Sequence, residues 1–513
     1  MRIRFRPTAA GPSTCDPGPR QADAASTDRI YHQRVFDIAT AAVEGALAAG
    51  ATYADARVTA RRIRSISVQN TAVESVSTIE QAGVGVRALM GSSWGFFATD
   101  GLDTRSARSA GGRAAEIARA SAAVPGPPLQ LADVPVSQDH YQTPHVEHPF
   151  AVPINDQAEL LIDSTRLMLE EPRVEFATGS LGFWDIETWL VSSQGHRIHQ
   201  NLIHSGGGIQ ATSIGDGESQ VRTYPQSRVH YESAGYESIR NWDYLANAPR
   251  VAAEAAALLG AAEMEECEKP LILEGSQVAL QIHESVGHAI ELDRILGWEA
   301  AFAGTSHLEL PRLGVHRYGS DLMNITADAT LPGALGSFGY DDEGTPARCV
   351  DIVKDGVWVG VLSGRDSASI AGLPPGGMVR ADGYDRMPMV RMTNVGLLPG
   401  DSSLEDMIAA TEDGVLMATN RSWSIDDKRL NFQFGCEIGW EIKHGKKGRM
   451  LKNPTYTGIT PRFWGTLDML GGQDEWVFWG TPNCGKGQPL QVGRTGHPAV
   501  PARFASVRMG VRG

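Results

Sequence analysis

Cysteine is scarce in this sequence, and its cysteines are widely separated. Five occur among 513 residues, with no C-x-x-C pair. Disulfide frameworks use more cysteines at closer spacings, so we do not expect one here. Reduced thiols are typical of the cytoplasm, and we predict a cytoplasmic protein. The five are Cys15, Cys267, Cys349, Cys436 and Cys484.

The sequence also lacks long apolar runs and an excess of positive charge. The alanine-rich stretch around 251–262 is too short to span a membrane and contains Glu254. No apolar segment follows the N-terminal arginines, so no signal peptide is expected. The formal net charge of −14 argues against a nucleic-acid or anionic-membrane partner, because both bind basic surfaces.

The chain is too long for one compact core, and its composition changes near 265–270. Two or three domains are expected at this length. The 57 glycines favour tight turns and short strands. After residues 265–270 most segments are short and β-prone. We predict a disordered extension over 1–27, an N-terminal domain over 28–265 with a linker at 125–153, and a C-terminal domain over 266–513.

Apolar periodicity predicts an α+β fold. Intervals of three and four residues indicate helices, and β-prone segments punctuated by glycine indicate strands. The N-terminal domain should combine an antiparallel sheet with helices. The C-terminal domain should be β-rich and carry one further helix, around 278–296. Helices are expected in the N-terminal domain near 35–50, 103–122, 155–170 and 241–262, with strands near 55–68, 73–90 and 92–99.

The stretch QIHESVGHAIELDR, residues 281–294, contains His283, Glu284 and His288. Zinc sites on one helix usually use histidines four residues apart, which lie about 40° apart around the axis. A spacing of five puts them about 140° apart in a regular helix. The two imidazoles can converge only if a π-bulge adds a residue to the turn, or if the helix bends at Gly287.

A zinc ion at this pair would give the neighbouring carboxylate a role. Glu284 could accept a proton from the metal-activated water and pass it to the leaving amine. A catalytic zinc needs three protein ligands, so a third must come from elsewhere in the chain. The motif alone has little specificity, and two histidines with ordinary hydrogen bonds would explain it equally well.

Four blocks in order resemble the TldD/PmbA family of metallopeptidases. HESVGHAIELD resembles the family's H-E-x-x-x-H signature, and MPMVRMTN resembles its P-M-P-R-M-T-N block. NCGKGQPLQVG resembles its C-G-K-x-G-Q segment, although here it is one residue shorter before the glutamine. The region around Trp423 to Phe432 looks divergent. In chain order, the four blocks are HESVGHAIELD at 283–293, DDEGTP at 341–346, MPMVRMTN at 387–394 and NCGKGQPLQVG at 483–493.

The resemblance implies that Cys484 completes a zinc site with His283 and His288, with Glu284 as the catalytic base. Thiolate and imidazole both suit zinc. Cys436 is the rival ligand, although it lacks the motif and reads more simply as a buried strand cysteine.

Each of the other polar residues in and around these blocks has two possible roles. Asp341 and Asp342 either orient a ligand histidine or form an acidic turn before Gly344, and Glu291 and Asp293 carry the same ambiguity. Three residues around the third block either contact substrate and stabilise an oxyanion or hold loops together. They are Arg380, Tyr384 and Arg391.

The predicted function is a zinc-dependent peptidase acting on small or unfolded peptides, which could add to a strand edge through main-chain hydrogen bonds. The resemblance implies the metal-bearing, TldD-type subunit, in a homo-oligomer or with a PmbA/TldE-type subunit. The alternatives are a non-catalytic peptide-binding or assembly subunit of such a complex, or a metal-dependent amide hydrolase. The peptide that is cleaved cannot be read from the sequence.

Overall fold

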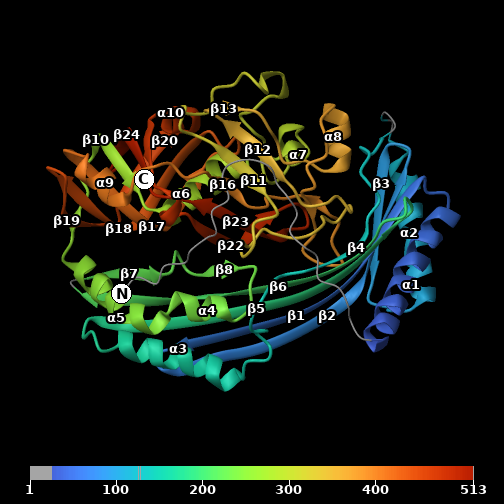
Figure 1. The fold of residues 1–513 in the computed structure, drawn as a ribbon, viewed down its shortest axis with the longest axis horizontal. Helices are drawn as coiled ribbons and strands as arrows, with labels where there is room; N and C mark the ends of the chain where they lie inside the picture. The colour runs from blue at the N-terminus through green and yellow to red at the C-terminus, as the bar shows by residue number, and fades with distance from the viewer. Residues whose placement is uncertain (1–25, 125, 127–128, 216, 512–513) are drawn as a thin grey trace.

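The computed structural model describes residues 26–124, 126, 129–215 and 217–511. The predicted disorder over 1–27 lies outside these ranges except for the last two residues, where α1 begins. The described chain has two large sheets with helices and several smaller strand pairs, which confirms the α+β class (Figure 1).

The N-terminal half is built on an eight-stranded sheet, mostly antiparallel, in the order β3-β2-β1-β5-β6-β4, with β7 and β8 also paired to β6. Four of its strands are 17 to 19 residues long. Here the expectation of short strands was wrong: several of the glycines lie within long strands, where neighbouring chain approaches closely. The strands are β1 Tyr53–Gln69, β2 Ala72–Met90, β3 Ser93–Thr99, β4 Gln138–Gln142, β5 Val174–Ser192, β6 Arg197–Gly215, β7 Glu218–Tyr224 and β8 His230–Glu232.

Helices cover one face of this sheet in two groups (Figure 1). One group packs its alanine-rich faces on one end of the strands, and the other packs on the opposite end. The second helix begins where the sequence predicts, because Asp103 accepts hydrogen bonds from the N–H groups of Arg105 and Ser106. The helices are α1 Ser26–Ala48 and α2 Thr104–Ser121, then α3 Ile154–Met168, α4 Glu237–Trp242 and α5 Tyr244–Leu259.

The C-terminal half contains a second eight-stranded sheet, whose core includes the long strand β18. The predicted domain boundary near 265–270 falls where β10 enters this sheet. Its strands are β9 Ala262–Glu263, β10 Cys267–Leu273, β17 Asp413–Ile425, β18 Asn431–Lys443, β19 Lys446–Lys452, β20 Thr455–Ile459, β21 Leu467–Leu470 and β24 Ala502–Met509.

Smaller elements complete this half and carry the candidate site. The remaining strands form one four-stranded sheet and two strand pairs: β11 Ile325–Asp328, β12 Cys349–Lys354, β13 Val357–Trp358 and β16 Val395–Leu397; β14 Val379–Arg380 and β15 Met389–Val390; β22 Val477–Lys486 and β23 Gln491–Ala499. The helices are α6 Gly275–Ile282, η1 His283–Gly287, α7 Leu292–Ile295, η2 Leu310–Arg312, α8 Arg365–Ala371, α9 Leu404–Ala409, α10 Thr460–Gly465 and η3 Gln473–Glu475.

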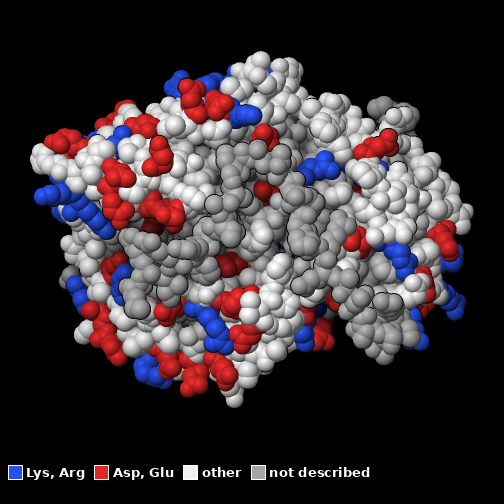
Figure 2. All heavy atoms as spheres, in the orientation of Figure 1, with Lys and Arg blue, Asp and Glu red and all other residues white. Residues whose placement is uncertain are grey.

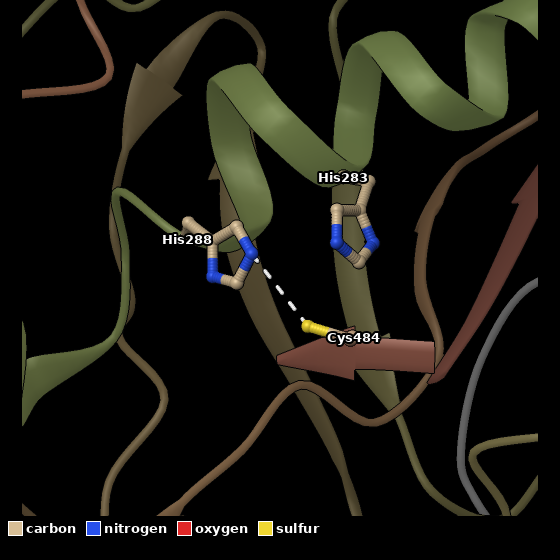
Figure 3. Close-up of side chains that lie close together, drawn as sticks. All are labelled: His283, His288 and Cys484. Atoms are coloured by element: carbon tan, nitrogen blue, oxygen red, sulfur yellow. Dashed lines mark hydrogen bonds between the residues drawn. The ribbon is translucent and has the colours of Figure 1, made fainter. Parts of the chain in front are cut away.

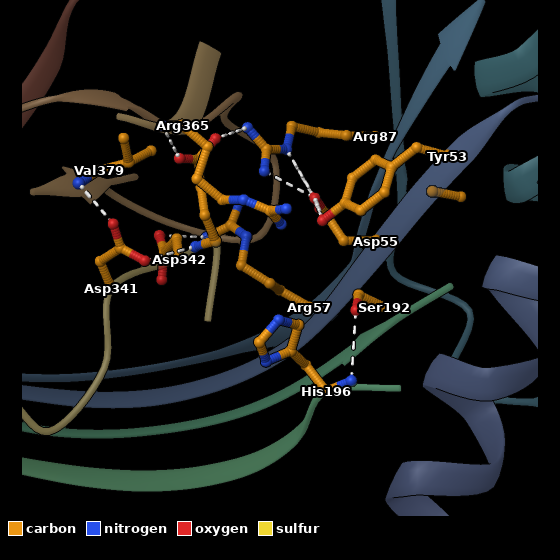
Figure 4. Close-up of polar contacts among 12 residues, drawn as sticks. Tyr53, Asp55, Arg57, Arg87, Ser192, His196, Asp341, Asp342, Arg365 and Val379 are labelled. Carbon is orange, nitrogen blue, oxygen red and sulfur yellow. Dashed lines mark hydrogen bonds and ion pairs between the residues drawn. The ribbon is translucent and has the colours of Figure 1, made fainter. Parts of the chain in front are cut away.

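Alternation along β1 assigns the two faces of the N-terminal sheet. Ala54 and Ala56 pack against the α1–α2 core, so Asp55 and Arg57 point to the opposite face. Arg57 forms an ion pair with Asp342 of the C-terminal half at 2.8 Å (Figure 4). The C-terminal half therefore packs against the face that the helices leave free.

No described helix is long and apolar enough to cross a membrane. On the face drawn in Figure 2, acidic and basic side chains are interspersed over the residues that the structure describes.

Two adjacent glycines of α2 offer a matched test of the helix packing. A Cβ at Gly111 would clash with the backbone of α1 at Ala42, whereas a Cβ at Gly112 meets nothing within 4 Å. We expect Gly112→Ala to raise the free energy of unfolding by about 0.5–1 kcal/mol and Gly111→Ala to lower it by about 1–3 kcal/mol. Urea denaturation measures both, and equal effects would contradict the α1–α2 contact.

Candidate metal centre

The two motif histidines meet because the helix that carries them changes its winding. After α6, residues His283–Gly287 form a π-helical turn, in which the N–H of His288 donates to the carbonyl of His283 at 3.2 Å. Of the two alternatives given by the spacing, a π-bulge or a bend at Gly287, the structure has the π-bulge. The extra residue brings the two rings to 4.9 Å between centroids. A spacing of five thus places both imidazoles on one side of the chain.

Buried side chains around the π turn favour this winding. The carbonyl of Ser285 accepts a hydrogen bond from the hydroxyl of Tyr318 at 2.6 Å. The Ser285 hydroxyl donates to the carbonyl of Gln281 and accepts from Trp464 Nε1. A Cβ at Gly287 would clash with Met392, so glycine allows the turn to pack closely.

Cys484 approaches the histidines from β22, a strand far along the sequence (Figure 3). Ligand atoms of His283, His288 and Cys484 all lie within 4.8 Å of one another, and all three residues are buried. Cys484 Sγ lies 3.6 Å from His288 Nε2. A sulfur at about 2.3 Å and a nitrogen at about 2.0 Å from a tetrahedral zinc lie about 3.5 Å apart. The residues therefore fit such an ion.

A carboxylate fixes the orientation of His288. Glu291 Oε2 lies 3.0 Å from His288 Nδ1, so this nitrogen donates and leaves Nε2 as the free lone pair facing Cys484. Burial alone would raise the pKa of Glu291, but Lys486 and His288 hold it well below its usual value. Lys486 also pairs with Asp293 at 2.8 Å. Of the two readings given for Glu291, the structure favours the one in which it orients a histidine.

A third histidine, which the sequence analysis missed, orients His283. His497 Nε2 lies 2.7 Å from His283 Nδ1, and His497 Nδ1 lies 3.0 Å from the carbonyl of Val395. A carbonyl only accepts, so His497 donates through Nδ1. Burial holds the pKa of His497 well below its usual value, and the neutral ring therefore accepts at Nε2. His283 must then donate through Nδ1, which leaves its Nε2 free. A single histidine in a strand gave no sequence signal for this role.

Cys484 lies in an environment that favours the thiolate, whereas the environment of Cys436 disfavours it. Burial would raise the pKa of Cys484, but His288 and Arg391 lower it below its usual value. Burial and Glu437 raise the pKa of Cys436 well above its usual value. Cys436 lies in the core on β18 and does not belong to the cluster of His283, His288 and Cys484.

A cavity of about 300 Å³ opens beside the three candidate ligands. Glu284 lines it and pairs with Arg429 at 2.8 Å. Trp423 and Arg429, from the segment that diverges from the family, also line it. The divergence therefore falls on the wall of the cavity that contains the candidate ligands.

Of the two interpretations given for Asp341 and Asp342, the described contacts favour the acidic turn over the orientation of a ligand histidine. Asp341 accepts backbone hydrogen bonds from Glu343, Thr345 and Val379 and so fixes its own turn. Burial raises the pKa of Asp341 to about 6. Asp342 accepts from Arg57 and from the N–H of Ala381 (Figure 4). Among the described contacts, Glu291 and His497 orient the histidines instead, because Asp341 and Asp342 are committed to the turn and to the N-terminal sheet.

None of the three residues predicted to contact substrate or an oxyanion is among those that line the Glu284 cavity. Arg391 donates to the carbonyl of Cys484, so it holds the strand that carries the thiol. Arg380 donates to the carbonyls of Met392 and Arg494. Tyr384 lies against Gly83 and Gly85 of β2, where it joins the two halves.

Comparison with known proteins matches this architecture. Residues 266–508 match the PmbA/TldA metallopeptidase C-terminal domain, and residues 54–122 match the PmbA/TldA metallopeptidase domain 1. A metalloprotease of Methanocaldococcus jannaschii is 27% identical over 79% of this chain and 86% of its own. A TldD homologue of Haemophilus influenzae, named a metalloprotease, is 30% identical over 45% of this chain and 46% of its own.

Solved structures show the same fold. TldE from Thermococcus kodakarensis superposes with a TM-score of 0.67 at 15% identity, covering 93% of this chain and 99% of its own. A Thermotoga maritima protein described as a candidate modulator of a DNA gyrase superposes at 0.73 and 15% identity, covering 92% of this chain and 99% of its own.

Fold and sequence together define a protein of the metallopeptidase class. The two matched domains cover more than half of the chain, and the predicted resemblance is confirmed. The chain belongs to the TldD/PmbA family of metallopeptidases.

The pKa difference between the two buried cysteines predicts different thiol reactivity. In protein stripped of metal by a chelator, we expect iodoacetamide at pH 7.5 to modify Cys484 faster than Cys436, because thiolate is the reactive form. Cys484 also lines the cavity. Peptide mapping by mass spectrometry measures both rates. Equal modification of the two would contradict the environment described for Cys484.

Proposed function

We propose that this chain is a zinc-dependent peptidase that cleaves small or unfolded peptides at the cavity beside His283, His288 and Cys484. One observation carries the proposal: three donor atoms converge within 4.8 Å at a cavity that Glu284 also lines. Each histidine has its other ring nitrogen occupied, by Glu291 or by His497. Such preorganisation is typical of metal ligands.

The donor set favours zinc over other metals. Two imidazoles and one thiolate leave a fourth tetrahedral position open, as catalytic zinc sites require. Oxygen-preferring ions such as Mg²⁺ and Ca²⁺ are disfavoured by this set. A Saccharolobus solfataricus relative, 27% identical over 40% of this chain and 44% of its own, is named a zinc metalloprotease. When bound, zinc supplies Lewis acidity that makes water nucleophilic near neutral pH.

In this proposal Glu284 moves protons in the cavity. It follows His283 directly in the chain, and its ion pair with Arg429 holds its side chain at the cavity wall. A carboxylate in this position can accept a proton from the attacking water and return it to the leaving amine. Arg429 Nε has no hydrogen-bond partner among the described residues. It is therefore free to interact with a developing oxyanion.

The cavity wall suits an extended peptide. Between Thr481 and Cys484 the pairing of β22 with β23 shifts register, and Pro482 and Asn483 lie in this irregularity and line the cavity. Main-chain groups in such a position can bond an added strand with little dependence on its side chains. This supports small or unfolded peptides as the substrates.

Zinc content and hydrolysis separate the roles of these residues. We expect wild type and Glu284→Gln to hold about one zinc per chain and Cys484→Ser to lose most of it, because three ligands are needed. Hydrolysis of a fluorescently labelled unfolded peptide should fall about 10²–10⁴-fold in Glu284→Gln. Elemental analysis and a fluorescence assay measure the two effects.

Glu116→Gln, on the exposed face of α2, is the matched control and should keep both properties. If Cys484→Ser retains its zinc, the ligand assignment is wrong. Full hydrolysis by Glu284→Gln would exclude the base role. Zinc binding without hydrolysis would favour the non-catalytic alternative.

We further propose that the chain works as an oligomer that pairs through the edge of β2. Residues 72–83 of this strand pair with β1 but with no second strand among the described residues. Residues 72–81 are exposed, including Val73, Val76 and Ile79. Open apolar edges of this kind pair readily with other chains. A second copy would shield them, and so would a TldE-type subunit of the same fold.

Light scattering after size exclusion tests the β2 edge. We expect a wild-type dimer that Ile79→Lys converts to monomer, because a buried edge does not accept an unpaired charge. Val146→Lys, in an exposed loop, is the control and should remain dimeric. A monomeric wild type would contradict self-association, and a dimeric Ile79→Lys would place the contact elsewhere.

A further inference from the structure

A second cavity lies between the two halves of the chain, separate in its lining from the one beside Glu284. It measures about 70 Å³. Strands β1, β5 and β6 of the N-terminal sheet form one wall, with His204 on β6. Segments of the C-terminal half form the other, including Arg380 and the β23 residue Arg494. A space of this size holds a few waters or one small ion.

The charges around this cavity do not balance. Four arginines line it against two aspartates. Asp342 is committed to Arg57. Asp382 is shared between two arginines, at 3.5 Å from Arg61 and 3.9 Å from Arg494, both longer than the 2.8 Å pair of Arg57 with Asp342. The remaining positive charge is therefore only weakly compensated by the described side chains.

Two of the arginines have only neutral hydrogen-bond partners in the described structure. Arg380 and Arg391 donate to main-chain carbonyls, and the Nε of each has no partner. Burial and the neighbouring arginines lower the pKa of Arg380 to about 9. Such an arrangement is costly unless a negative charge completes it. An anion would also relieve the repulsion among the arginines.

A buried histidine is a second, independent observation that points to a ligand in this cavity. His204 is 3% exposed, and both of its ring nitrogens lack a hydrogen-bond partner among the described residues. Burial, with Arg494 and Arg380, holds its pKa well below the usual value. One ring nitrogen of a neutral imidazole is always a donor. Buried donors normally have an acceptor, so we expect an acceptor within the cavity that His204 lines.

We propose that this cavity binds a small oxyanion, a carboxylate or a phosphate group, through Arg380, Arg494 and His204. A planar guanidinium pairs well with such groups, and its hydrogen bonds to them are stronger than those to carbonyls. Arg391 also lines the cavity and holds the carbonyl of Cys484. Anion binding therefore couples to the strand that carries the thiol. The site does not depend on the proposed peptidase activity.

Calorimetric titration of metal-free, full-length protein with inorganic phosphate tests the site directly. We expect one phosphate per chain, with affinity at least about tenfold weaker in Arg380→Gln and in Arg494→Gln, because each loses a charge-assisted hydrogen bond. Arg503→Gln is the control, since Arg503 of β24 pairs with Asp468 of β21, away from the cavity lining, and it should bind as wild type does. Circular dichroism of each variant establishes that it is folded.

Peptide competition then identifies the source of the oxyanion. If a short peptide with a free terminal carboxylate displaces phosphate and its amidated form does not, the natural occupant is a peptide carboxylate. If neither competes, the occupant is a free inorganic anion. No saturable binding by wild type would overturn the proposal, and so would unchanged affinity in both folded arginine variants.

Discussion

The candidate centre depends on one backbone hydrogen bond, from the N–H of His288 to the carbonyl of His283 five residues earlier. A regular helix would place these side chains about 140° apart. The π turn removes that separation, and Ser285 and Tyr318 stabilise it from within the core. A π turn is less stable than an α turn, and such turns occur frequently at functional sites. Here all five residues of the π turn are buried.

The residues behind the candidate ligands form a connected polar network. Lys486 reaches back from the C-G-K segment to Glu291 and Asp293, which follow the histidine motif. Two blocks far apart in sequence thus meet through one buried lysine that pairs with two carboxylates. On the other side, His497 and the carbonyl of Val395 set the tautomer of His283. Together these contacts aim both free imidazole nitrogens towards Cys484.

Local patterns predicted most of the first half of the fold. The helix caps and apolar periodicity gave α2 and α3 to within a residue or two, because those signals are local. The length of β5 and β6 was missed, since glycines that read as turns instead admit close packing. The five-residue spacing of His283 and His288 predicted that the helix must either bulge or bend, and the structure shows the bulge. Cys484 needed the family resemblance.

Other residues were beyond sequence reasoning because their roles arise only from three-dimensional proximity. His497 and Arg429 come from separate strands and loops and have no motif spacing to the ligands. Asp341 and Asp342 carry the acidic chemistry expected of residues that orient a metal ligand. The fold uses that chemistry to close a turn and to join the two halves. Identical side chains serve either purpose, so only the structure distinguishes them.

X-ray absorption spectroscopy at the zinc edge measures the proposed ligand set itself. We expect one sulfur at about 2.3 Å and two imidazole nitrogens at about 2.0–2.1 Å in the zinc-loaded wild type. The sulfur contribution should disappear in any zinc that Cys484→Ser retains. A wild-type spectrum with only nitrogen and oxygen neighbours would contradict the site described here.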